Sequence, residues 1–124
     1  MGRILRRMQI KKGRADRREA LFGGERAVLV WDLLAGAAAP PFAAVLACEL
    51  EPGGRVGAHQ QQEHAEIVIG LEGDGEARVD DRPVPLGPGD VVHLPLGATL
   101  SIQNRSPSAP LRYLIVKAPP SNVR

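Results

Sequence analysis

The sequence predicts an all-β protein with little or no helix, and three observations lead to this prediction. Short apolar segments recur at roughly ten-residue spacing, and glycine- and proline-rich turns separate them. No segment after residue 20 keeps a helical apolar period for three turns. The 14 glycines and 11 prolines among 124 residues suit many short strands joined by tight turns. Strands in such a series form a β-sandwich or a small barrel.

The first expected strands are residues 27–34 and 42–50, which are apolar and are separated by an alanine-, glycine- and proline-rich segment. The sequence EPGG at residues 51–54 is typical of a turn. Residues 65–71 form a β-branched run that ends at Gly73-Asp74-Gly75, a hairpin signal. Helix is expected only as a short piece near residues 15–21.

The second half of the chain continues the same pattern. Residues 76–79 lead into a turn at Asp80-Asp81, and two further strands flank the turn GPGD. The last expected strands are residues 98–103, which alternate, and residues 111–118. In the segment VVHL at residues 91–94, alternation puts Val91 and His93 on one face, but it does not say which face is inside.

Length and composition predict one domain. We expect a basic N-terminal arm or edge strand over residues 1–20, the barrel over residues 21–118 and a flexible tail over residues 119–124. The single cysteine, Cys48, lies in an apolar run and is expected to fill the core, which favours a reducing, cytoplasmic setting. No apolar run approaches the roughly 20 residues that span a bilayer, so no membrane partner is expected.

Charge is concentrated at the N-terminus. Residues 1–20 carry a net charge of +6, and the remaining residues carry −4. This arm has no recognisable DNA-binding motif and no aromatic residue among its cations, so no nucleic-acid partner is expected. We expect a solvated arm or an edge strand that docks on the acidic face of a partner subunit.

The candidate site lies in residues 53–73, where a polar segment changes into an apolar one. His59 and Gln61 are two residues apart, so in an extended segment their side chains share one face. Glu66 follows at the start of the run IVI. An imidazole, an amide oxygen and a carboxylate therefore converge on one point if the segment lines a barrel.

These residues resemble the cupin family. Its first motif, G-x5-H-x-H-x(3,4)-E-x6-G, is matched by Gly53, His59, Glu66 and Gly73. Its second motif, G-x5-P-x-G-x2-H-x3-N, is matched at four positions, which are Gly89, Pro95, Gly97 and Asn104. The resemblance covers about residues 25–118. It implies a cupin-type jelly-roll β-barrel and, because cupins commonly pair through their sheets, a homodimer.

The resemblance also implies where a metal would bind. In metal-binding cupins the ligands are the two histidines and the glutamate of the first motif and the histidine of the second. Here Gln61 and Leu100 replace two of those histidines, while His59 and Glu66 are kept. Leucine has no donor atom, and an amide oxygen is a weaker ligand than imidazole for transition metals. Two alternatives therefore remain. Either His59, Gln61 and Glu66 bind one divalent ion (zinc, iron, nickel or manganese), or the protein has no cofactor.

Two further histidines and Leu100 complete the candidate ligand-binding residues. His64 precedes Glu66, and His93 occupies a position that often carries a bulky side chain in this family. Without a metal, His59 and Glu66 are candidate catalytic residues for acid–base work on a bound small molecule.

Three functions from different classes therefore stay open. The first is a cupin that binds a small organic molecule in a barrel with a degraded metal site. The second is an enzyme, such as an isomerase, a polyketide cyclase or a dioxygenase, that acts through His59 and Glu66 with or without a metal. The third is a structural or interaction module whose barrel is filled by its own side chains.

Overall fold

The computed structural model describes residues 13–119. The expected basic arm over residues 1–20 therefore lies largely outside the described residues, and the expected tail over residues 119–124 lies almost wholly outside them. The described residues form ten strands and one short 3-10 turn, η1 (Leu21–Gly23). The strands are β1 (Asp16–Glu19), β2 (Ala27–Asp32), β3 (Ala44–Leu50), β4 (Arg55–Gln60), β5 (Ala65–Glu72), β6 (Gly75–Val79), β7 (Arg82–Leu86), β8 (Val91–Leu94), β9 (Thr99–Asn104) and β10 (Leu111–Ala118).

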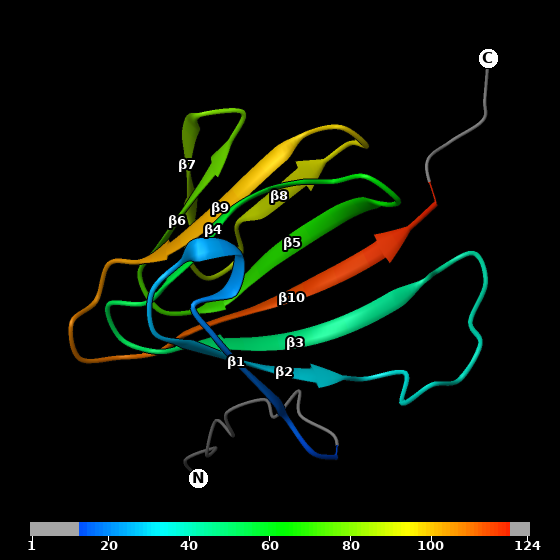
Figure 1. Ribbon diagram of the computed structural model, residues 1–124, viewed down its shortest axis with the longest axis horizontal. Coiled ribbons are helices and arrows are strands. Elements are labelled where there is room, and N and C mark those ends of the chain that lie inside the picture. Colours follow the sequence, from blue (N-terminus) through cyan, green and yellow to red (C-terminus); the bar gives the residue numbers. More distant parts are fainter. Residues whose placement is uncertain (1–12, 120–124) are drawn as a thin grey trace, which may run out of the picture.

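The strands form two antiparallel sheets that face each other (Figure 1). One sheet has six strands in the order β1-β2-β3-β10-β5-β8, and the other has four in the order β4-β9-β6-β7. Strands distant in sequence thus become neighbours, because β10 pairs with both β3 and β5. The prediction of an all-β jelly-roll barrel is confirmed.

The core fills the space between the two sheets. Val68 and Leu111 come from the six-stranded sheet, Leu86 and Ile102 come from the four-stranded sheet, and all four are almost completely buried. Inward side chains alternate with outward ones most clearly along β8 and β9, as the pleat requires. Cys48 belongs to this buried cluster, in agreement with its predicted role as core filler.

The structure differs from the sequence-based expectations at one turn and at one strand. The turn after β5 does not close a hairpin, because β5 and β6 lie in different sheets and the turn at Gly73 carries the chain between them. The strand β4 was not predicted, since RVGAHQ is largely polar and lacks a β-branched run. β4 is an edge strand of its sheet, and its outer edge is partly covered by η1 and by backbone hydrogen bonds between Glu25 and Arg55.

The described part of the N-terminal segment covers the end of the barrel near β4. Strand β1 pairs with β2 and forms an edge of the six-stranded sheet. The 3-10 turn η1 follows and contains Phe22 with a φ of 53°, a left-handed conformation that is uncommon for a bulky residue. No helix within residues 13–119 is long and apolar enough to span a membrane.

Candidate functional site

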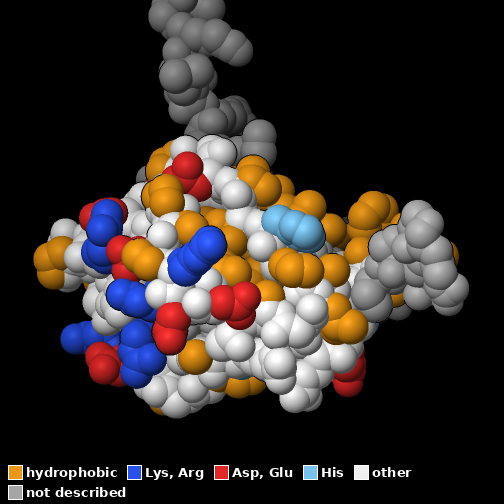
Figure 2. Space-filling model, turned by 90° about the horizontal axis from the view of Figure 1, so that it is seen from above, with side chains coloured by type: hydrophobic (Ala, Val, Ile, Leu, Met, Phe, Trp, Pro, Cys, Tyr) orange, Lys and Arg blue, Asp and Glu red, His pale blue; other side chains and the backbone are white. Residues whose placement is uncertain are grey.

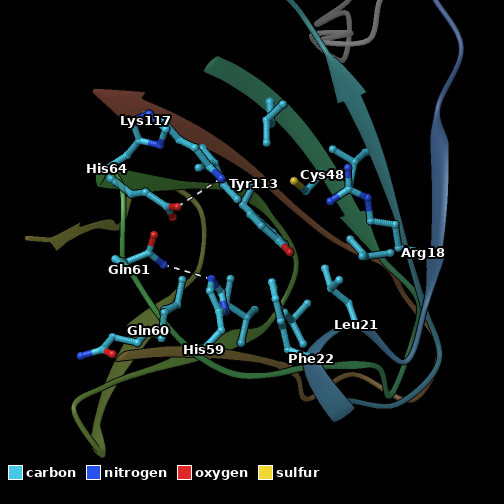
Figure 3. Close-up of a pocket in the computed structure, with 18 of the residues that line it drawn as sticks. Arg18, Leu21, Phe22, Cys48, His59, Gln60, Gln61, His64, Tyr113 and Lys117 are labelled. Atoms are coloured by element: carbon cyan, nitrogen blue, oxygen red, sulfur yellow. Dashed lines mark hydrogen bonds and ion pairs between the residues drawn. The ribbon is translucent and has the colours of Figure 1, made fainter. Parts of the chain in front are cut away.

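His59 and Gln61 are placed by β4 and by the turn that follows it. His59 lies opposite Leu100 of β9. The backbone of Gln61 is held on both sides by the turn before β9: its N–H donates to Ala98 O (2.9 Å), and its carbonyl accepts from Gly97 N (2.7 Å). The Gln61 side chain then lies 6% exposed with its amide Nε2 at 3.0 Å from His59 Nε2 (Figure 3).

The second pair at the site joins β5 to β10. Glu66 and Lys117 are cross-strand partners, so their side chains lie on the same face of the sheet. Lys117 Nζ lies 3.5 Å from Glu66 Oε2, and the Glu66 side chain is only 2% exposed. Burying a lone carboxylate costs several kcal/mol, so the Lys117 ammonium supplies the opposite charge that a carboxyl group in the interior requires. The other oxygen, Oε1, is buried without a hydrogen-bond partner among the described residues.

His59 is held as a neutral ring. Phe22 stacks on it, with ring centroids 4.0 Å apart and an angle of 16° between the planes. Burial lowers the pKa of His59, whereas the backbone of Gly57 and the Glu66 carboxylate act in the opposite direction, and Lys117 adds to the lowering. A nitrogen of the Gln61 amide can only donate, so His59 Nε2 accepts, as an unprotonated ring nitrogen does.

These side chains surround one cavity of about 270 Å³ between the sheets. Figure 3 shows His59, Gln61 and Lys117 at one side of it and Arg18 and Cys48 at the other. Burial raises the pKa of Cys48 to about 12 and raises that of Tyr113 well above its ordinary value. Neither group therefore supplies an anion at neutral pH. The remaining walls are mainly aliphatic, with Leu21, Val28, Leu46, Leu100 and Ile115 among them.

The structure brings together five of the six predicted site residues, which are His59, Gln61, His64, Glu66 and Leu100. It does not bring His93 to this cavity. Val92 and Leu94 face the core, so His93 is exposed on the opposite face of β8, beside a separate surface depression.

Three residues of the cavity were missed by sequence reasoning. The sequence places Lys117 only in the last expected strand, and it places Arg18 only in the basic arm or edge strand. Phe22 had no motif to mark it. A signal existed for Lys117, because it lies four residues after Tyr113 in a strand and so shares the face of that buried ring.

Comparison with known proteins identifies the family. A family model described as a cupin domain matches residues 46–117. The chain belongs to the cupin family. A search of curated proteins finds no match. Among solved structures, this cupin is similar to a predicted oxalate decarboxylase from Thermotoga maritima, with 24% identity, 94% of this chain and 99% of that chain covered, and a TM-score of 0.75.

Two further structures are similar to this cupin. A cupin 2 domain-containing protein from Halorhodospira halophila is 33% identical, with 68% of this chain and 56% of that chain covered and a TM-score of 0.62. KdgF from Halomonas sp. is 16% identical, with 83% and 87% covered and a TM-score of 0.64.

The side chains at the position of a cupin metal do not fit a metal ion. The lone pair of His59 Nε2 is directed at the Gln61 amide, and Oε2 of Glu66 is directed at the Lys117 ammonium. His59 Nδ1 and Glu66 Oε1 are buried without a hydrogen-bond partner among the described residues, but a positive charge already lies beside Glu66. Leu100, opposite His59, offers no donor atom. Within residues 13–119, no three His, Cys, Asp or Glu side chains form a group that could hold a metal ion. The side chains instead form a cavity with one polar side. The ammonium group of Lys117 supplies the positive charge beside Glu66.

Proposed function

We propose that this cupin binds a small organic molecule inside its barrel and does not require a metal to do so. The cavity of about 270 Å³ carries this proposal. Native interiors pack as densely as organic crystals and contain few voids larger than a water molecule. A structural module with a filled barrel would leave no room of this size, so the cavity favours ligand binding over that alternative.

The cavity also indicates the size and polarity of the molecule. Its volume corresponds to roughly nine water molecules at ~30 Å³ each, which suits a ligand of about ten to fifteen non-hydrogen atoms. The aliphatic walls favour an apolar body. The polar side, formed by His59, Gln61, Glu66 and Lys117, offers hydrogen-bond donors and acceptors that orient the ligand.

Filling the cavity tests this proposal. Ile115 and Leu114 are neighbours on β10, but only Ile115 lines the cavity, since alternation puts Leu114 on the outer face. A library of small organic fragments is screened by ligand-observed NMR against the native protein, Ile115→Phe and Leu114→Phe. We expect fragments that bind the native protein and Leu114→Phe but lose at least tenfold in affinity for Ile115→Phe. Equal binding to all three proteins, or no binding fragment at all, would contradict the proposal.

Metal analysis of untagged protein tests the second half of the proposal. We expect zinc, iron, nickel and manganese together at well below one ion per chain, because Leu100 supplies no donor atom and the Lys117 ammonium beside Glu66 repels a metal cation. Mass spectrometry of the metal content checks this. A stoichiometric metal that disappears in His59→Ala would refute it and would favour a metal-assisted enzyme.

An acid–base enzyme is the second candidate, and one observation favours it. His59 and Glu66 lie in one cavity, burial lowers the pKa of His59, and one oxygen of Glu66 lacks a hydrogen-bond partner among the described residues. A neutral imidazole accepts a proton from a bound molecule at neutral pH once that molecule takes the place of the Gln61 amide at Nε2. Deuterium exchange from D₂O into a bound fragment, present in the native protein and absent in His59→Asn, would favour this candidate over binding alone.

A further inference from the structure

Arg18 faces the cavity from a strand that lies outside the matched cupin motifs. It is the cross-strand partner of Val28, which is 3% exposed and belongs to the core. Cross-strand partners point to the same face of a sheet, so Arg18 points inward although β1 is an edge strand. Figure 3 shows its side chain extending into the cavity beside Cys48. Its charge lowers the pKa of the Cys48 thiol against the effect of burial, which agrees with this placement.

The guanidinium of Arg18 retains binding capacity. Its Nε lies 2.8 Å from Asp16 Oδ2, on the same face of β1. Neither terminal nitrogen has a hydrogen bond or an ion pair with a residue that the structure describes. The side chains of Arg18 and Asp16 are 46% and 65% exposed, and pairs this exposed contribute little energy. Asp16 therefore orients the guanidinium more than it neutralises it.

The other charges at the cavity do not offset Arg18. Two carboxylates line it, Glu66 and Glu63. Glu66 is compensated by Lys117, and Glu63 is exposed to solvent, which screens its charge. Two cations that line the cavity have carboxylate partners among the described residues. The partner of Lys117 is the buried Glu66, whereas the partner of Arg18 is Asp16, which is exposed to solvent.

We propose that the ligand of this barrel is a small organic anion whose carboxylate binds the terminal nitrogens of Arg18. This inference rests on the proposed function and specifies the class of ligand. Guanidinium matches a carboxylate with two parallel hydrogen bonds, a geometry that an ammonium does not offer. The apolar body of the ligand packs against Leu21, Leu46 and Ile115, and its far end reaches His59 and Gln61.

The test compares probes that differ in charge but hardly in shape. Hexanoate is paired with hexanamide and benzoate with benzamide, and binding is measured by NMR titration at fixed ionic strength. The variants are Arg18→Gln, Arg18→Lys and a matched control, Arg17→Gln. Arg17 lies on the same strand, is similarly exposed and lines a different cavity. Thermal unfolding of each variant verifies that the fold is retained.

For the native protein we expect each carboxylate to bind at least tenfold more tightly than its amide, since hydrogen bonds to charged groups are among the stronger ones. Arg18→Gln should remove this preference and leave amide binding unchanged, Arg18→Lys should restore part of it, and Arg17→Gln should behave as native. Equal binding of acid and amide, or equal effects of the two glutamine variants, would overturn the anion proposal while leaving ligand binding intact. Failure of every acid and amide to bind, together with a failed fragment screen, would refute the proposed function itself.

Discussion

At the level of single residues, the state of His59 follows from its surroundings. Phe22 stacks on one face of the ring, and the Gln61 amide donates to Nε2. Burial lowers the pKa of His59 because transfer out of water disfavours the imidazolium form. The ring is therefore an acceptor at neutral pH, which is the state that acid–base work or ligand hydrogen bonding requires.

This lowered pKa predicts how stability depends on pH. In the unfolded chain His59 takes up a proton near pH 6.5, whereas in the folded protein it does so only at lower pH. Below about pH 6.5 the unfolded state therefore binds more protons, and stability falls as pH falls. We expect the Tm of the native protein to drop more between pH 7.5 and pH 5.5 than that of His59→Gln, measured by calorimetry. Parallel pH profiles for the two proteins would show that His59 titrates normally.

At the level of elements, the contact between η1 and β4 positions the aromatic side of the site. Gly24 and Gly57 let two backbone segments approach so closely that a Cβ at Gly57 would overlap the carbonyl of Phe22. The ladder between β4 and β9 shifts register between Val56 and His59, beside this contact. The absence of a side chain at Gly57 thus allows Phe22 to reach the ring of His59.

Gly57→Ala should therefore separate η1 from β4. We expect a loss of stability of about 1–3 kcal/mol, the usual cost of overpacking, in urea unfolding. We also expect the pKa of His59, followed by NMR, to move back towards 6.5, because displacement of Phe22 exposes the ring to water. Ala58→Val is the matched control, since the neighbouring Ala58 is exposed. An unchanged His59 pKa in a folded Gly57→Ala protein would show that the contact does not shield the ring.

At the level of the whole molecule, the outer face of the six-stranded sheet carries exposed apolar side chains. Ile67 is 41% exposed and Val91 is 62% exposed. They come from the adjacent strands β5 and β8. Figure 2 shows one face of the molecule where charged side chains gather at one end and apolar ones surround a histidine towards the other. Exposed apolar residues on neighbouring strands are typical of a surface that pairs with another subunit.

The homodimer expected from the family resemblance stays a prediction, and this outer face is where we place it. Light scattering after size-exclusion chromatography should give a dimer for the native protein and a monomer for Ile67→Lys, since a buried unpaired charge opposes association. Phe42→Ser serves as the control because Phe42 is also exposed, at 50%, but lies in the segment between β2 and β3. A native monomer at high micromolar concentration would contradict the prediction.

The sequence by itself determined most of the strand pattern, although it missed β4 and the change of sheet after β5, and it grouped His59, Gln61 and Glu66. These features are local: alternation fixes which side chains share a face, and glycines mark positions such as Gly53, with a φ of 71°, that other residues rarely adopt. The strand pattern alone left a sandwich or a small barrel open, and the resemblance of the two motifs to those of cupins implied the jelly-roll barrel.

Only the tertiary structure decided which groups complete that site. Lys117 meets Glu66, and Arg18 meets the cavity, through pairings between β10 and β5 and between β1 and β2 that no local pattern specifies. The same holds for His93, whose face of β8 is known only once Val92 and Leu94 are seen in the core. The physical reason is that a strand fixes the relative orientation of its own side chains, whereas burial and the arrangement of neighbouring strands decide which face meets the site.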